Sequence, residues 1–117
     1  MEDFEIRAQA RYVWHSPRKM RLVVDRVRGM DALEALSVLR LMPQRAAEPV
    51  YKLVNSAIAN AENNYGMIGE DLYIAEISAD EGPMRRWRRF GARGRFKPIR
   101  KRSSHINLIL RERALEY

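Results

Sequence analysis

A run of positive charge constrains this chain more than any other feature of its sequence. The segment from Met84 to Arg102 carries ten basic side chains and no acidic one. The whole chain has 22 Lys and Arg against 15 Asp and Glu, so the rest of it holds 12 basic and 15 acidic residues. Ten like charges are too costly to desolvate in a core, so the segment must project. The net charge of +7 is therefore local, and we predict that this segment meets a polyanion.

The residues on either side of the basic segment alternate between apolar and polar, as strands do. Leu72 to Asp80 and Ser104 to Arg111 both have this period of two. The glycine-bracketed sequence Gly91-Ala-Arg-Gly94 lies at the midpoint between them, which predicts the turn of a hairpin. An arm of about ten residues on each side reaches roughly 30 Å. Aromatic side chains lie among its charges and are suited to stacking on unpaired bases: Trp87, Phe90 and Phe96.

The N-terminal part begins with a strand pattern and continues into a helix. Apolar residues alternate with polar ones from Phe4 to Tyr12, which predicts a half-buried strand with Tyr12 on its apolar face. Ser16-Pro17 is typical of a helix start, and Gly29 of a helix end. The helix between them has an apolar face at helical spacing, formed by Met20, Val23, Val24 and Val27.

Two more helices are predicted before the first of the two later strands. Asp31-Ala-Leu-Glu34 resembles a capping box, and the helix that it opens ends at Met42-Pro43. Its apolar residues lie almost all round, so we expect it to be well covered. A third helix is predicted from about Gln44 to Tyr65, where Pro49 implies a slight kink or a later start.

These elements predict an α+β fold, a three-stranded antiparallel sheet packed with three helices, plus a long projecting basic β-hairpin. We expect a single domain over residues 1–117. Its globular core would comprise residues 1–80 and 101–117, and its extended hairpin arm about 81–100.

Several classes of function are disfavoured by the composition. The chain has no Cys and two His, so we predict no metal site, and we expect no cofactor. No apolar run approaches the ~20 residues of a membrane helix, and the acidic N-terminus is unlike a signal or transit peptide. We therefore expect no membrane partner. Asp80 and Glu81 are the only carboxylates that suggest a catalytic cluster near the arm, so we predict that the protein is not an enzyme.

A second basic site is predicted at the start of the first helix. Arg18, Lys19 and Arg21 lie in its first turns, where the helix dipole favours acids. Free backbone N–H groups and three cations together suit a phosphate.

Four motifs then carry a resemblance to a known family. They are Ser16-Pro-Arg-Lys-Met-Arg-Leu-Val23, Asn55-Ser-Ala-Ile-Ala-Asn-Ala-Glu62-Asn63, Asp80-Glu-Gly-Pro83, and Ala92-Arg-Gly-Arg95 followed by Ile99-Arg-Lys-Arg-Ser-Ser-His-Ile106. In register over nearly the whole chain, they closely resemble large-subunit ribosomal protein twenty-two of the bacterial type. Family tips usually read Pro-Arg-Ala where this chain has Phe90-Gly91-Ala92, and a small Ala where it has Phe96.

The resemblance implies a structural constituent of the large ribosomal subunit in the cytoplasm. Such a protein binds 23S-type ribosomal RNA, aids its assembly and lines the polypeptide exit tunnel with its hairpin tip. The implied partners are this RNA, neighbouring large-subunit proteins (protein four at the tunnel constriction) and the nascent chain; we expect no homo-oligomer. The expected RNA contacts are Ser16, Arg18, Lys19, Arg21, Lys52, Asn60, Arg85, Arg86, Trp87, Arg88, Arg89, Arg93, Arg95, Lys97, Arg100, Lys101, Arg102, Ser103 and His105. The expected tunnel-lining tip is Arg88, Arg89, Phe90, Gly91, Ala92, Arg93, Gly94 and Arg95.

Two other functions compete with this interpretation. A regulatory DNA- or RNA-binding module would lay the basic β-ribbon in a groove of the nucleic acid. It is disfavoured because ten cations crowd one arm, few side chains suit base reading and no dimerisation surface is evident. An enzyme acting on nucleic acid would have to rely on Asp80 and Glu81, which are more typical of a surface turn or of charge partners of the arm.

Overall fold

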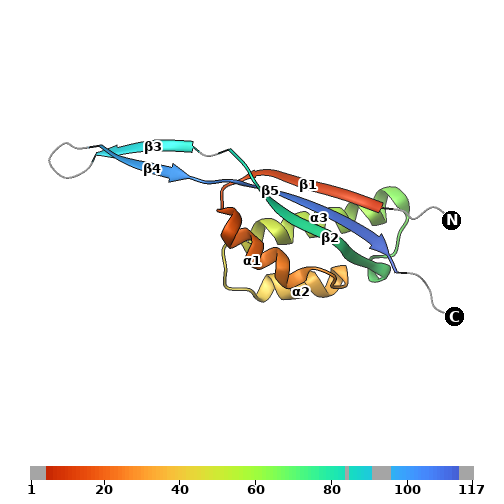
Figure 1. Ribbon diagram of the computed structural model, residues 1–117. Helices are drawn as coiled ribbons and strands as arrows, with labels where there is room; N and C mark the ends of the chain where they lie inside the picture. The colour runs from red at the N-terminus through yellow and green to blue at the C-terminus, as the bar shows by residue number, and fades with distance from the viewer. Residues whose placement is uncertain (1–4, 84, 91–95, 114–117) are drawn as a thin grey trace.

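Three helices pack on one face of a three-stranded sheet, and a hairpin leaves one end of that sheet (Figure 1). The structure is a computed structural model that describes residues 5–83, 85–90 and 96–113, with backbone alone over 85–90 and 96–101. In chain order its elements are β1 (Glu5–Val13), α1 (Pro17–Val27), α2 (Ala32–Leu41), α3 (Ala47–Tyr65), the short 3-10 helix η1 (Gly69–Asp71), β2 (Leu72–Glu81), β3 (Arg85–Phe90), β4 (Phe96–Lys101) and β5 (Ser104–Glu112). The predicted α+β class and three-stranded antiparallel sheet are confirmed.

The last strand occupies the middle of the sheet. The strand order is β1-β5-β2, and β5 pairs antiparallel with both neighbours. Alternation along β5 turns Ile106, Leu108 and Leu110 into the core, where each is buried. The other face of the sheet is open and polar, so the single core lies between the sheet and the helices.

Helix α1 forms as its sequence predicts. Ser16 caps it by accepting a hydrogen bond at Oγ from the Lys19 backbone N–H (3.4 Å), and Pro17 is the first helical residue. The four apolar residues of the predicted face, from Met20 to Val27, are completely buried. Gly29 follows the helix with φ +81°, a conformation that costs glycine little.

Helix α2 departs from two expectations. Asp31 precedes it but makes no capping bond, because its carboxylate instead accepts a hydrogen bond from Nε of Arg113 (2.5 Å). The expectation of all-round cover is also wrong. Leu33 and Leu41 are 40% and 83% exposed, because α2 packs chiefly on α3 and leaves one side open.

Pro49 predicts either a slight kink in the third helix or a later start, and α3 shows the later start. Its first residue is Ala47, so Pro49 lies in the first turn, where a backbone N–H has no intrahelical partner. The Ala47 N–H is satisfied by the carbonyl of Gln44 in the preceding turn (3.1 Å). Gly66 ends the helix with φ +64°, and the Met67 N–H closes its last turn on the carbonyl of Ala61 (3.1 Å).

The end of β1 contains a bulge that the sequence does not reveal. The pairing register with β5 shifts between Ala10 and Val13, and Tyr12 adopts φ +57°. Its side chain is 55% exposed, so the expectation that Tyr12 shares the apolar face is wrong. Left-handed backbone costs a non-glycine residue about 1–2 kcal/mol. Part of that cost is offset by a hydrogen bond from the Tyr12 N–H to Nδ1 of His105 (3.1 Å).

The basic segment forms two paired strands. β3 and β4 pair antiparallel from Arg85 opposite Lys101 to Phe90 opposite Phe96, as expected of a hairpin. In Figure 1 this pair extends away from the helices, beyond the ends of β2 and β5. The predicted turn at Gly91–Gly94 lies outside the described residues. The division into a core and an arm at about residues 81–100 stays a prediction.

The left-handed backbone at Tyr12 predicts that a glycine variant is more stable there than an alanine variant, the reverse of the usual order in a strand. Tyr12→Gly and Tyr12→Ala both remove the ring, but only alanine keeps a Cβ that resists φ +57°. We expect the glycine variant to be more stable than the alanine variant by about 1 kcal/mol. Chemical denaturation of both variants measures this difference. At Gln9, which lies in regular strand, the alanine variant should instead be more stable than the glycine variant. If the same substitution were the more stable one at both positions, the strained backbone at Tyr12 would be contradicted.

An ion pair between β1 and β5 predicts a pH dependence. Arg111 and, to a smaller extent, Arg7 hold the pKa of the Glu5 carboxyl below its usual value by hydrogen bonding to it. A lowered folded-state pKa stabilises the fold above the unfolded pKa, and this stabilisation is lost as the pH falls through the folded pKa. We expect Glu5→Gln to lower stability at neutral pH and to match the wild type once the carboxyl is protonated. Denaturation midpoints from pH 7 to pH 3 measure this, with the exposed Glu76→Gln as control.

Candidate nucleic-acid interface

The start of α1 presents unpaired positive charge. No acidic residue lies in its first turn, and Arg18 and Lys19 are exposed. Within the described part of the chain neither side chain forms an ion pair. The helix dipole adds partial positive charge at the same place, so this end of α1 suits an anion such as a phosphate.

The root of the hairpin lies against the start of α1. Pro17, the first residue of the helix, lines a hollow of about 240 Å³ together with Glu81, Gly82, Arg102 and Ser103. Arg102 is exposed there. Residues some 85 positions apart therefore lie side by side, and the cations at the helix start adjoin the hairpin.

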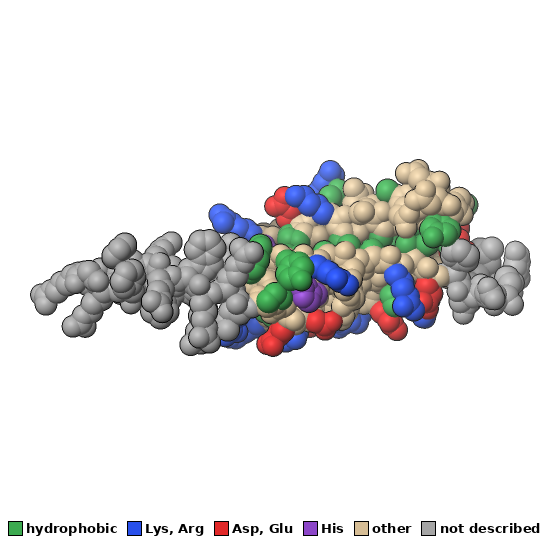
Figure 2. All heavy atoms as spheres, turned by 90° about the horizontal axis from the view of Figure 1, so that it is seen from above, with side chains coloured by type: hydrophobic (Ala, Val, Ile, Leu, Met, Phe, Trp, Pro, Cys, Tyr) green, Lys and Arg blue, Asp and Glu red, His purple; other side chains and the backbone are tan. Residues whose placement is uncertain are grey.

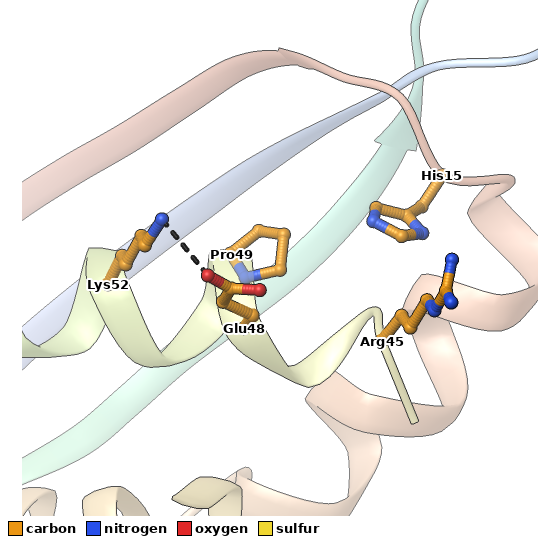
Figure 3. A pocket seen from close by; sticks show the side chains of 5 residues that line it. All are labelled: His15, Arg45, Glu48, Pro49 and Lys52. Atoms are coloured by element: carbon orange, nitrogen blue, oxygen red, sulfur yellow. Dashed lines mark ion pairs between the residues drawn. The ribbon is translucent and has the colours of Figure 1, made fainter. Parts of the chain in front are cut away.

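A second hollow on the same side of the molecule is also basic. It measures about 610 Å³ and lies between the β1–α1 connection and the start of α3 (Figure 3). Lys52 is paired with Glu48 (Nζ–Oε1 3.2 Å), while His15 and Arg45 face the hollow without a carboxylate partner in the described part. The Ser104 hydroxyl donates to the His15 carbonyl (2.7 Å), which holds the connection in place. The sequence analysis missed His15 and Arg45, which lie 30 residues apart in two different connections, so no local pattern links them.

Ser103 supports the hairpin root from inside. Its side chain is 1% exposed, and its hydroxyl donates to the carbonyl of Pro83 (2.6 Å). The Gly82 N–H donates to the Ser103 carbonyl (3.0 Å), so the two chains are joined just before the hairpin. A Cβ on Gly82 would lie 2.4 Å from Ser103 Oγ, closer than atoms approach. The Ser103 side chain is therefore a positioning group and not available for the RNA contact that the sequence suggested.

Arg21 is partly occupied by the sheet. Its Nε donates to the carbonyl of Ala79 (3.2 Å), and two turns further along, Arg28 donates to the carbonyl of Ile77 (2.8 Å). Both acceptors lie on the outer edge of β2. These two arginines cover an edge that would otherwise be open to another strand. Arg21 therefore has a structural role beside any contact with RNA.

The remaining predicted residues lie apart or outside the described side chains. Asn60 is half-buried two turns along α3 from Lys52, and its amide oxygen accepts a hydrogen bond from Asn64. His105 lies on the open face of the sheet beside Tyr12. The side chains of Arg85, Arg86, Trp87, Arg88, Arg89, Arg93, Arg95, Lys97, Arg100 and Lys101, and the tip with Phe90, Gly91, Ala92 and Gly94, lie outside what the structure describes.

Elsewhere the described body shows no comparable gathering of basic side chains in the view of Figure 2. Figure 2 shows basic and acidic side chains interspersed over the described body seen from above. Asp80, one of the two carboxylates considered for catalysis, accepts a hydrogen bond from Asn107 (2.9 Å). Over residues 5–83 and 102–113 no cluster of His, Asp or Glu is arranged to hold a metal. None of the helices described is long and apolar enough to cross a membrane.

Comparison with known proteins places this chain among the ribosomal proteins. The model of the family described as ribosomal protein L22p/L17e matches residues 8–111, and the chain belongs to this family. It is 50% identical over 109 residues to the large ribosomal subunit protein uL22 of Thermoanaerobacter sp. strain X514, covering 93% of this chain and 98% of that protein. It is 52% identical over 106 residues to the uL22 of Caldicellulosiruptor saccharolyticus, covering 91% and 87%.

Family membership confirms the coarse functional predictions. The protein is a bacterial-type structural constituent of the large ribosomal subunit, located in the cytoplasmic ribosome, and its class is not that of an enzyme. Ribosomal RNA and other ribosomal proteins are accordingly its partners.

The contact between Gly82 and Ser103 predicts a rescue. Gly82→Ala should destabilise the fold by about 1–3 kcal/mol, because the added methyl overlaps Ser103 Oγ. Ser103→Ala alone should cost about 1–3 kcal/mol by leaving the Pro83 carbonyl without its donor. The double variant should be clearly more stable than the sum of the two losses predicts, because the overlapping atom is gone. Urea denaturation of the four proteins measures the coupling, and additive losses would contradict this packing.

Proposed function

We propose that the protein binds 23S-type ribosomal RNA with the end of the body that carries the hairpin root, and that this binding helps the RNA to fold and assemble. The protein would act in two ways, by neutralising phosphate charge and by holding RNA segments in position. Lys and Arg neutralise phosphates that approach one another in a compact RNA, and the hairpin holds distant segments together. No chemical step is involved.

The observation that carries this proposal is the convergence, at one end of the body, of cations without an ion-pair partner among the described residues. Arg18 and Lys19 from α1, Arg102 from the hairpin root and Arg45 from the turn before α3 come from three separate parts of the sequence. The hairpin with its remaining nine cations leaves from the same end. A surface of this kind matches a polyanion that continues from the body along the arm.

The hairpin is proposed to enter the RNA and to reach the polypeptide exit tunnel. Its tip, from Arg88 to Arg95, would contribute to the tunnel wall near a constriction formed with large-subunit protein four, where the nascent chain passes. This part of the proposal rests on the family resemblance and on the strand pairing of the basic segment. The departures at Phe90-Gly91-Ala92 and Phe96 would alter the width of the tunnel locally.

Sedimentation of a cell lysate on sucrose gradients at low and at moderately high salt tests the proposal. A protein threaded into RNA should migrate with the large subunit at both salt concentrations. A protein adsorbed by charge alone should be released at high salt. Recovery in the light fractions at both salts, with subunits intact, would contradict the proposal and favour the regulatory nucleic-acid binder.

The α1 start predicts a measurable change in salt dependence. Arg18→Ala with Lys19→Ala removes two phosphate contacts, so the slope of log affinity against log salt should fall by about 1.4–1.8. Fluorescence anisotropy with a fragment of the 23S-type RNA measures it. Arg7→Ala with Arg113→Ala removes the same charge at the opposite end of the body and should leave the slope nearly unchanged. Equal changes in both variants would mean that net charge, and not this site, governs binding.

A further inference from the structure

We infer that the open face of the sheet, at the end where the hairpin leaves, carries a stacking site for an unpaired RNA base with Tyr12 as its platform. The inference rests on the proposed RNA binding and adds the chemistry of one contact. It concerns a different part of the surface from the cationic start of α1. The evidence is the conformation of Tyr12, its contact with His105, and the polar side chains beside them.

Tyr12 is held in an exposed orientation by the bulge of β1. A large residue rarely adopts φ +57°, and here the conformation rotates the side chain from the apolar face to solvent. The Tyr12 N–H, which regular pairing would direct to a backbone carbonyl, donates to Nδ1 of His105. The backbone therefore sets the direction of the ring, and the pairing of Val13 with Ser104 just after it prevents it from relaxing.

The two rings form a preorganised aromatic pair. Their centroids lie 5.0 Å apart with planes at 89°, an edge-to-face contact that orients the tyrosine. Because Tyr12 remains 55% exposed, this contact leaves much of its ring open. Bases splayed out of a folded RNA stack on such rings, and an oriented ring loses little freedom on binding.

A row of hydrogen-bonding side chains lies beside this pair on the same face. The Gln9 amide donates to Asn107 (2.8 Å), and the Asn107 amide donates to Asp80 (2.9 Å). Arg11 donates to Gln9 at the outer end of the row (3.0 Å). These groups offer both donors and acceptors to the edge of a base.

The negative charge of Asp80 on this face favours a base over a phosphate as the bound group. Asp80 on β2 lies opposite His105, so a carboxylate lies on the side of the histidine away from Tyr12. It would repel a phosphate, whereas it can accept hydrogen bonds from the amino groups of cytosine, adenine or guanine. Two cations could hold the neighbouring phosphates: Arg11 directly precedes Tyr12, and Arg102 lies three residues before His105.

The test compares two charge-matched probes with the full-length chain. One probe is a single-stranded RNA octamer with a central 2-aminopurine, and the other is an octamer of the same length without bases. Tyr12→Leu should weaken binding of the first by about tenfold and leave the second unchanged, because only the first can stack. Its salt slope should be unchanged, since stacking releases no counterions. Tyr12→Phe should bind like the wild type.

The control variant is Tyr65→Leu, which removes a tyrosine of similar exposure (51%) at the far end of α3. It should bind both probes like the wild type. Equal weakening of both probes by Tyr12→Leu would show a structural effect and overturn the inference. Unchanged binding of both would also overturn it and leave this face to a protein partner. A wild type that binds neither probe nor the 23S-type fragment would count instead against the proposed function.

Discussion

The antiparallel pairing of β5 with both β1 and β2 is the constraint on which the rest of this structure depends. It places the last strand between the first and the second, so the N-terminal and C-terminal segments close one sheet. It also requires the chain to leave at the end of β2 and return at the start of β5, at the same end of the sheet. The basic segment is inserted between these two strands. Its root is consequently pinned by hydrogen bonds between backbones, and its paired strands β3 and β4 lead away from the helices.

The same topology explains why the cationic surface is local. The connection from β1 to α1, the turn before α3 and the hairpin root all lie at this end, so Arg18, Arg45 and Arg102 lie at the same end of the body. Elsewhere positive side chains serve the fold. Arg21 and Arg28 cover the outer edge of β2, and Arg111 joins β5 to β1 through Glu5. Arginines of similar appearance in the sequence thus divide into those that hold the sheet and those that have no ion-pair partner in the described part of the chain, which we propose to meet RNA.

Most of the fold could be predicted because local patterns agree with the final packing. The apolar face of α1, its Ser-Pro start and the alternation of β5 each follow from short-range spacing, and the structure bears them out. The failures have long-range causes. Asp31 does not cap α2 because Arg113, 82 residues later in the chain, takes its carboxylate. Leu33 and Leu41 are exposed because the position of α3 decides which side of α2 is covered.

The candidate site divides in the same way. The sequence by itself determined that the chain has a basic hairpin, a cationic helix start and the motifs of its family, since these depend on residues that are near one another in the chain. Only the tertiary structure decided that Ser103 is buried, that His15 and Arg45 share a hollow, and that Tyr12 is turned outward against His105. Each of these depends on a strand register or on the docking of α3, and such contacts between distant segments leave no periodic trace in the sequence.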